Sequence, residues 1–328
     1  MIEVPARELQ DLTADLTAAV YAPAPQLTIT IETGSSGDDE IHLHAGGQGF
    51  WIARLLSELG IRTTLCASFG GETGAVLQAL VRRGPIQEVV SVSAASANGA
   101  YVHDRRDGQR REIAGQRAGV LGRHDRDELY TASVAAGLRS RICVLGGYQP
   151  TSTPVPPDHY RRLAADLRAN GTMVVADLSG QLREAAMAGG LDVLKTSHED
   201  LAADGLLVDP DDQEELLATM RALKARSDIT HLVVTRGAEP TLALSGGKVV
   251  SLHGPRLEVL DPRGAGDSVT AGITAGLCRG ASFWDSLRTG VAAATLNVAR
   301  HGLATGRADA IAALAAEIEV RPVEETHK

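Results

Sequence analysis

The order of strand-like and helix-like segments is what most constrains how this chain folds. From residue 124 to residue 234, short apolar runs alternate with longer segments whose apolar residues recur at helical spacing. Parallel strands need long crossover connections, which helices commonly supply. The alternation therefore predicts an α/β fold: a doubly wound, mostly parallel sheet flanked by helices. The predicted strands are 141–145, 172–177, 191–194 and 229–234, and the predicted helices are 124–138, 157–169, 181–188, 198–203 and 210–224.

A different pattern interrupts this alternation nearer the N-terminus. The segments 87–93, 99–104 and 110–114 are short, strand-like and joined by Gly, Asp and Arg turns. Short strands joined by such turns favour antiparallel pairing. We therefore expect a small antiparallel patch, and a β lid built from about 38–46 and 97–115.

The two ends of the chain are expected to lie outside the main domain. Leu9, Leu12, Leu16 and Val20 recur at helical spacing, which predicts an amphipathic helix. The predicted organisation is an N-terminal helical extension at 1–25, one domain at 26–320 and a C-terminal tail at 321–328.

Composition limits the partners and the compartment. The 328 residues carry a net charge of −9, so there is no general basic field to attract nucleic acid or an anionic membrane surface. The three cysteines are widely spaced and form no CxxC motif, which fits a reducing cytoplasm. No basic-then-apolar leader and no apolar run of about 18 residues occurs. The sequence predicts a cytoplasmic protein with a small-molecule substrate.

The stretch Gly264-Ala265-Gly266-Asp267 opens a predicted helix at 266–279. Small residues at a helix N-terminus let an anion approach the unpaired backbone N–H groups. Asp267 next to a bound phosphate could take a proton from an attacking hydroxyl. A capping Asp after a glycine-rich turn is the alternative interpretation.

Several stretches, in order, resemble the PfkB (ribokinase-like) carbohydrate kinases. The stretch at 260–277 is similar to the family's D-T-x-G-A-G-D signature, and that at 45–60 to its G-G-K-G-x-N-x-A signature. Segments 65–74, 174–201 and 232–244 resemble the intervening strands and turns. The branch containing 1-phosphofructokinase and tagatose-6-phosphate kinase is most similar.

The resemblance implies an ATP-dependent kinase that transfers the γ-phosphoryl group to a hydroxyl of a sugar or sugar-phosphate-like acceptor. Asp267 matches the catalytic base, and Gly264, Ala265 and Gly266 match the anion hole. The resemblance also implies ATP with Mg²⁺, and Asp200 acting on the metal through water. The implied nucleotide contacts are Lys195, Ser197, Thr235, Gly237 and Asn297, and the implied substrate contacts are Gly46, Gly47, Gln48 and Trp51.

Four positions depart from the family pattern. Where the family has Lys, Asn, Asn and Glu, this sequence has Gln48, Trp51, Ser197 and Asp200, respectively. Trp51 either walls the substrate pocket or belongs to the core, and Asn297 either contacts the nucleotide or faces solvent.

The acceptor-binding groups are also altered. The Asp with which the family binds sugar hydroxyls is missing from this sequence. Either Asp38 or Asp39 takes its place, or both lie in a solvated turn. The arginine that holds a substrate phosphate has no clear counterpart. Arginines 105, 106, 110 and 111 could serve only if they point inward. We therefore do not expect fructose 1- or 6-phosphate to bind in the family's usual way.

Two alternatives remain at this point. One is a kinase of nucleosides or of unphosphorylated sugars, and the other is a catalytically weak relative that binds a nucleotide or metabolite and regulates or assembles with a partner. The lid also offers a surface for a homodimer.

Overall fold

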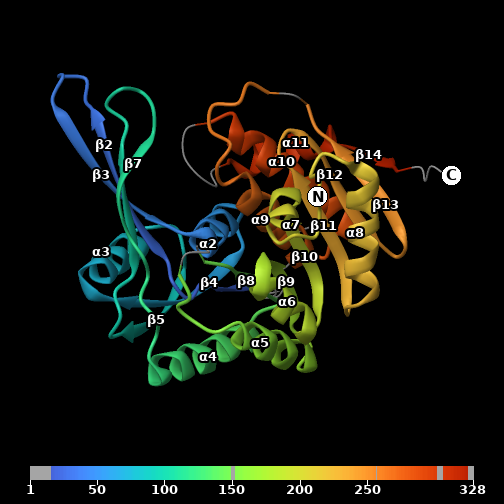
Figure 1. Ribbon diagram of the computed structural model, residues 1–328, viewed down its shortest axis with the longest axis horizontal. Coiled ribbons are helices and arrows are strands. Elements are labelled where there is room, and N and C mark those ends of the chain that lie inside the picture. Colours follow the sequence, from blue (N-terminus) through green and yellow to red (C-terminus); the bar gives the residue numbers. More distant parts are fainter. Residues whose placement is uncertain (1–15, 149–151, 256, 301–305, 324–328) are drawn as a thin grey trace, which may run out of the picture.

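A ten-stranded sheet forms the centre of the protein (Figure 1). The computed structural model describes residues 16–148, 152–255, 257–300 and 306–323. The strand order is β14-β13-β12-β11-β10-β9-β8-β1-β4-β5. Every neighbouring pair from β5 through β11 is parallel, and β12, β13 and β14 extend the sheet in antiparallel pairs. The strands are β1 (Thr17–Tyr21), β4 (Arg62–Gly70), β5 (Glu88–Ala94), β8 (Ile142–Gly146), β9 (Met173–Asp177), β10 (Leu191–Ser197), β11 (Ile229–Arg236), β12 (Glu239–Ser245), β13 (Lys248–His253) and β14 (Glu319–Pro322).

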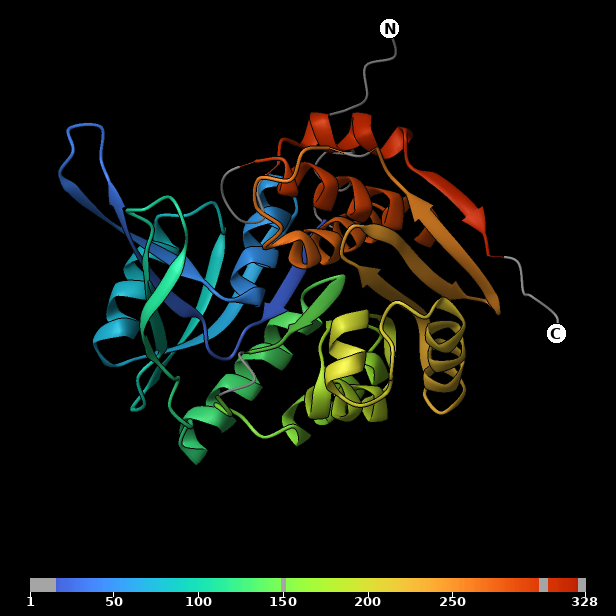
Figure 2. The same cartoon turned by 45° about the horizontal axis from the view of Figure 1, so that its top comes forward.

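Helices cover both faces of this sheet (Figure 2), and each face has its own hydrophobic core. Successive residues of a strand point to opposite faces, so Ala18 and Val20 join one core while Ala19 and Tyr21 join the other. The doubly wound prediction is confirmed. The first core packs against α2 (Gln48–Glu58), α3 (Gly71–Arg82), α9 (Ala265–Cys278), α10 (Phe283–Val298) and α11 (Ala308–Ala316). The second packs against α4 (Arg123–Leu138), α5 (Asp158–Ala169), α6 (Gly180–Gly189), α7 (His198–Ala203) and α8 (Gln213–Ala225).

A second, four-stranded sheet projects from one side of the body, where Figure 1 shows it in blue and green. It contains β2 (Gln26–Thr33), β3 (Asp39–Gly46), β6 (Gly99–Asp104) and β7 (Arg111–Gln116), in the order β3-β2-β6-β7. This sheet matches the predicted lid and adds β2 to it. We call it the lid.

Three local predictions are wrong. Residues 17–21 form strand β1 rather than a helix, because this segment is buried inside the sheet between β8 and β4 and is apolar towards both faces. Segment 88–94 is the edge strand β5 of the main sheet rather than part of the antiparallel patch, since it pairs in parallel with β4. The predicted tail begins inside β14, which pairs with β13. Leu9 and Leu12 lie outside the described residues.

Among the described residues, every helix is too short or too polar to cross a lipid bilayer.

Candidate active site

A pocket of about 350 Å³ lies between the lid and the carboxyl ends of the parallel strands. Gly147 follows β8, Asp177 ends β9 and Asp200 lies just beyond β10, so three neighbouring strand ends contribute to its wall. This edge is where open α/β sheets commonly bind ligands. The lining residues are Ala24, Gln26, Gly47, Gln48, Trp51, Tyr101, Arg110, Gly147, Tyr148, Asp177, Leu178, Ser179, Leu182, Asp200, Arg263, Gly264 and Asp267.

The predicted anion hole is the first turn of α9. Gly264 is the N-cap residue and has φ of +73°, a left-handed conformation that glycine adopts without strain. A Cβ built on Gly266 would lie 2.6 Å from Nζ of Lys195, so this position is small because the Lys195 ammonium occupies the adjacent space. The N-terminal amides of a 14-residue helix and a buried lysine therefore lie together at the start of α9.

Asp267 lies in this first turn and lines the pocket. Burial, followed by the nearby Asp177 carboxylate, raises the pKa of Asp267 to about 7, while Lys195 opposes the rise. A carboxylate with a pKa near neutrality exchanges protons readily at physiological pH. The geometry thus gives Asp267 the proton affinity that a general base needs.

Asp177 and Lys195 form a buried ion pair beneath Asp267. Lys195 Nζ lies 3.1 Å from Asp177 Oδ1, and Thr270 Oγ1 donates to Asp177 Oδ2 at 2.6 Å. Burial alone would favour a neutral amine, but the carboxylates of Asp177, Asp267 and Asp200 raise the pKa of Lys195 and keep it cationic. Asp177 was missing from the predicted site; its position at the end of a buried strand, next to Leu178-Ser179-Gly180, was the available signal.

Ser197 and Asp200 cap the short helix α7 reciprocally. The Asp200 amide donates to Ser197 Oγ at 3.0 Å, and Ser197 Oγ donates to Asp200 Oδ2 at 2.7 Å. The capping box holds the Asp200 carboxylate at the pocket wall. Ser197 itself does not line the pocket.

The other predicted nucleotide contacts do not line this pocket. Thr235 pairs with Ser197 on the neighbouring strand, and Gly237 lies in the following turn with φ of +59°. Asn297 is fully buried, so the solvent-facing alternative is wrong. Its Nδ2 donates to the Arg263 carbonyl at 2.7 Å, which anchors the loop that leads into α9.

The predicted substrate contacts lie at the start of α2. Gly47 caps the helix with φ of +97°, and Gln48 Oε1 accepts a hydrogen bond from the Gly147 amide at 2.6 Å. Trp51 is only 9% exposed, so it belongs to the core, and it also lines the pocket. Gly46 lies behind this turn and does not line the pocket.

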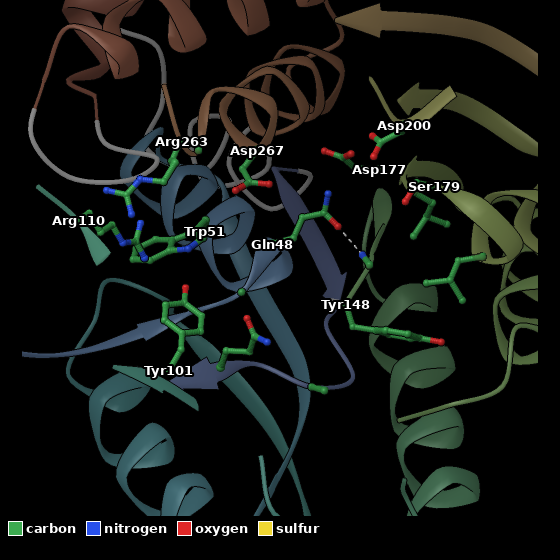
Figure 3. Close-up of a pocket in the computed structure, with 17 residues that line it drawn as sticks. Gln48, Trp51, Tyr101, Arg110, Tyr148, Asp177, Ser179, Asp200, Arg263 and Asp267 are labelled. Carbon is green, nitrogen blue, oxygen red and sulfur yellow. Dashed lines mark hydrogen bonds between the residues drawn. The ribbon is translucent and has the colours of Figure 1, made fainter. Parts of the chain in front are cut away.

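The charged side chains divide the pocket into two ends (Figure 3). Asp177, Asp200 and Ser179 lie at one end, Arg110 and Arg263 lie at the other, and Asp267 and Gln48 lie between them. The sequence prediction offered Arg110 only as one of four candidates, and it did not select Arg263 or Tyr101. One anionic group of a ligand can therefore bind directly at the arginine end of the pocket. A second anionic group can bind at the carboxylate end if a cation binds there as well.

Metal-binding capacity at the carboxylate end is limited. Within the described ranges, no three His, Cys, Asp or Glu side chains gather into a cluster that could hold a metal ion by themselves. Magnesium commonly takes only one or two protein carboxylates and completes its shell with water and substrate phosphates. The carboxylates at this end of the pocket are those of Asp200 and Asp177, and Asp177 is already paired with Lys195.

Comparisons with known proteins agree with this geometry. A family model described as pfkB family carbohydrate kinase matches residues 15–310. The ATP-dependent 6-phosphofructokinase isozyme 2 of Mycobacterium tuberculosis is 28% identical over 271 residues, covering 80% of this chain and 77% of that protein. The tagatose-6-phosphate kinase of Staphylococcus epidermidis is 24% identical over 237 residues, covering 71% and 74%.

Solved structures share the fold. The phosphofructokinase-2 of Escherichia coli, in complex with potassium, superposes with a TM-score of 0.79 at 21% identity, covering 92% of this chain and 98% of that one. The ribokinase of Arabidopsis thaliana, complexed with ribose and ATP, gives a TM-score of 0.69 at 19% identity, covering 91% and 98%. This chain belongs to the pfkB family of carbohydrate kinases and is a phosphotransferase that uses ATP as donor and a sugar hydroxyl as acceptor.

Proposed function

We propose that the chain phosphorylates a sugar phosphate, with Asp267 as the general base. The observation that supports this most strongly is the carboxylate of Asp267, which lines the pocket at the first turn of α9 with its pKa raised to about 7 by burial and Asp177. A base at this position meets the acceptor hydroxyl and the transferred phosphoryl group together.

The proposed reaction is an in-line displacement. Asp267 accepts the proton of the acceptor hydroxyl, the hydroxyl oxygen bonds to the γ-phosphorus of ATP, and the bond between that phosphorus and the β–γ bridging oxygen breaks to release ADP. The amides of Gly264, Ala265 and Gly266, together with that of Asp267, donate to the phosphoryl oxygens as charge develops on them. Lys195, which lies against Gly266, adds a buried positive charge at the same place.

Magnesium would bind at the carboxylate end. Asp200, with Asp177, would hold the ion directly or through water, and the ion would offset the negative charge of the ATP phosphates. Thr235 and Gly237 remain predicted nucleotide contacts at the adjacent strand end.

The lid is proposed to close over the acceptor and to exclude water from the transfer step.

The lid also supports a homodimer, because Ile41, Leu43 and Ile113 are 66%, 46% and 49% exposed on its strands. Substitution Ile41→Glu, compared with wild type by light scattering, tests this contact: the dimer predicts a shift towards monomer, and unchanged mass contradicts it.

The proposed location is the cytoplasm, since Cys66, Cys143 and Cys278 are free thiols, as a reducing compartment would leave them.

The proposed function is tested by ADP release from Mg·ATP in the presence of sugars, sugar phosphates and nucleosides. The proposal predicts acceptor-dependent ADP release that is largest with a phosphorylated sugar. Preference for a nucleoside would support the nucleoside kinase alternative. Tight ATP binding without acceptor-dependent release across the whole panel would favour the catalytically weak relative.

A further inference from the structure

A buried asparagine lies where the chain passes from the main domain into the lid. Asn98 directly precedes lid strand β6 and is only 3% exposed. Its Oδ1 accepts a hydrogen bond from the Gly70 amide at 2.8 Å, and its Nδ2 donates to the carbonyls of Pro25 at 3.0 Å and Ser68 at 3.1 Å. Pro25 directly precedes lid strand β2, whereas Ser68 and Gly70 belong to β4 of the main sheet. The side chain of Asn98 therefore connects the lid to the main sheet.

The backbone of Asn98 makes further contacts with both parts of the protein. Its amide donates to the Gly70 carbonyl at 3.1 Å. Its carbonyl accepts hydrogen bonds from Thr73 Oγ1 at 2.8 Å and from Gln116 Nε2 at 3.0 Å. Thr73 belongs to α3 of the main domain, and Gln116 is the last residue of lid strand β7. Every polar atom of Asn98 is thus hydrogen-bonded, and three lid strands meet the main domain at this residue.

The space around Asn98 is filled. A Cβ built on Gly74 would lie 2.6 Å from Asn98 Oδ1, and a Cβ built on Gly70 would lie 2.2 Å from the carbonyl oxygen of Ser96. The segment before β6 therefore lies directly against the end of β4 and the start of α3. Because every hydrogen-bonding group of Asn98 is used and its surroundings are tightly packed, the residue is held in one position.

Two residues of the pocket wall are close to Asn98 along the chain. Gln26 directly follows Pro25, and Tyr101 lies three positions after Asn98. Both line the pocket, and Tyr101 extends into it from β6 (Figure 3). The starts of β2 and β6 also pair with each other, with Gln26 opposite Gly99. A displacement of Asn98 would therefore move this side of the pocket wall.

We propose that Asn98 is a positioning residue for the pocket: it fixes the lid on the main domain and thereby holds Gln26 and Tyr101 in the pocket wall. Asn98 itself does not line the pocket. Replacing its side chain removes hydrogen bonds from buried backbone groups on both sides of the connection, which lowers the free energy needed to open the lid locally. The main sheet keeps its own hydrogen bonds.

Trp51 provides a spectroscopic signal for the position of the lid. A Cβ built on Gly46, the last residue of lid strand β3, would lie 3.6 Å from Cζ2 of Trp51. The indole ring thus packs against the base of the lid. The chain has two tryptophans, so Trp284→Phe leaves Trp51 as the single one. A lid that opens more often would give the quencher acrylamide greater access to this ring, which is 9% exposed.

Three variants in the Trp284→Phe background test the connection. Asn98→Ala removes every side-chain hydrogen bond of Asn98. Asn98→Asp keeps an oxygen that accepts from the Gly70 amide, but a carboxylate cannot donate to the carbonyls of Pro25 and Ser68. Gln116→Leu leaves Asn98 intact and removes only the hydrogen bond from the end of β7. It serves as the variant of least disruption, should the Asn98 variants fail to fold.

Thr172→Val is the matched control in the main domain. Thr172 is buried, and its Oγ1 donates to the Gly137 carbonyl at 3.3 Å. It directly precedes β9, at the opposite end of that strand from Asp177. Valine has nearly the shape of threonine, so this variant loses a buried hydrogen bond without altering the connection to the lid.

The measurements are acrylamide quenching of Trp51 and backbone hydrogen exchange, both without ligand. We expect amides of β2 and β6 to exchange about 10- to 100-fold faster in both Asn98 variants, the usual effect of leaving buried polar groups without partners. Trp51 quenching should increase in the same variants, and Gln116→Leu should show a smaller change in the same direction. Amides of β9 and β10 should exchange as in wild type, and Thr172→Val should leave the lid and Trp51 unchanged.

Unchanged lid exchange and Trp51 quenching in folded Asn98 variants would overturn the proposal. An equal change in Thr172→Val would do so too, because it would show a general loss of stability. If neither Asn98 variant folds, Gln116→Leu decides: faster lid exchange with increased quenching supports the proposal, and wild-type behaviour contradicts it.

Steady-state assays with Mg·ATP and fructose 6-phosphate, tagatose 6-phosphate or fructose 1-phosphate add a functional measurement, and only this part rests on the proposed kinase function. Asn98→Asp should raise the acceptor KM about tenfold, as the loss of one hydrogen bond would, while kcat and the KM for ATP stay within a fewfold. A lower kcat at unchanged acceptor KM would contradict a role through the pocket wall. Wild-type enzyme without turnover of any of the three counts against the proposed function, while quenching and exchange still decide on Asn98.

Discussion

Lys195 Nζ lies 3.1 Å from Oδ1 of Asp177, and both side chains are almost completely buried beneath the first turn of α9. This ion pair links two neighbouring strands and helix α9. Asp177 ends β9, Lys195 belongs to β10, and Thr270 of α9 donates to the second oxygen of Asp177. The pair thus sets the electrostatic environment of Asp267.

Breaking this pair should be costly to stability. Lys195→Met leaves Asp177 buried without its cation, and removing one partner of a buried pair typically lowers the free energy of unfolding by about 3–5 kcal/mol. Urea denaturation measures this loss. The double variant Asp177→Asn/Lys195→Met should recover part of it, since residue 177 no longer carries a buried charge without its partner. If the losses of the two single variants simply add in the double variant, the coupling is contradicted.

The rate should depend on pH in a defined direction. Because burial and Asp177 raise the pKa of Asp267 to about 7, its carboxylate becomes protonated below that pH and can no longer accept a proton. We expect kcat/KM to fall by about tenfold per pH unit on the acid side. A profile that stays flat from pH 8 to pH 5 would exclude Asp267 as the titrating base.

Stability should depend on the same proton. The folded-state pKa of Asp267 is about 7 and the ordinary value is 3.8, so between these values the folded state holds a proton that the unfolded chain releases. Wild-type stability from this group is therefore lost as pH rises through that window. Asp267→Asn cannot ionise, so its unfolding free energy relative to wild type should increase from pH 5 to pH 8. A difference that is constant with pH would contradict the raised pKa.

The anion hole should tolerate no side chain at Gly266. Its Cβ would meet Lys195 Nζ at 2.6 Å, so Gly266→Ala must displace the ammonium from the phosphoryl site. We expect weaker ATP binding by calorimetry and a lower melting temperature. Gly276→Ala is not a suitable comparison, because its Cβ would lie 2.6 Å from Oγ of Ser286. The comparison is Gly280→Ala, whose Cβ would lie 3.7 Å from Nη2 of Arg141; because its φ is +76°, this variant isolates the cost of backbone strain. If Gly266→Ala binds ATP as tightly as wild type does, Lys195 does not contribute there.

Much of the fold could be predicted from the sequence because the alternation of strands and helices from 124 to 234 reports burial directly. The wrong secondary-structure predictions concern strands whose pattern of apolar residues fits more than one structure. Strand β1 is apolar towards both cores, so its residues also satisfy helical spacing. Strand β5 lies at the sheet edge and is half-buried, so its pattern imitates an antiparallel strand.

The site was only partly predictable for a different reason. Asp267 and the small residues before it could be predicted, because a carboxylate after small residues at a helix start is a local sequence pattern. The inward direction of Arg110 depends on His103 and Tyr101, and that of Arg263 on Asp261. Sequence spacing records none of these side-chain orientations.

The most direct measurement of the central claim is the kcat of Asp267→Asn with the preferred acceptor at saturating Mg·ATP. Asparagine has almost the shape of aspartate but cannot take the hydroxyl proton. If Asp267 is the base, kcat of the variant should be lower by about 100-fold or more, with ATP affinity and the fold retained. A kcat within a fewfold of wild type would contradict the assignment of Asp267 as the base.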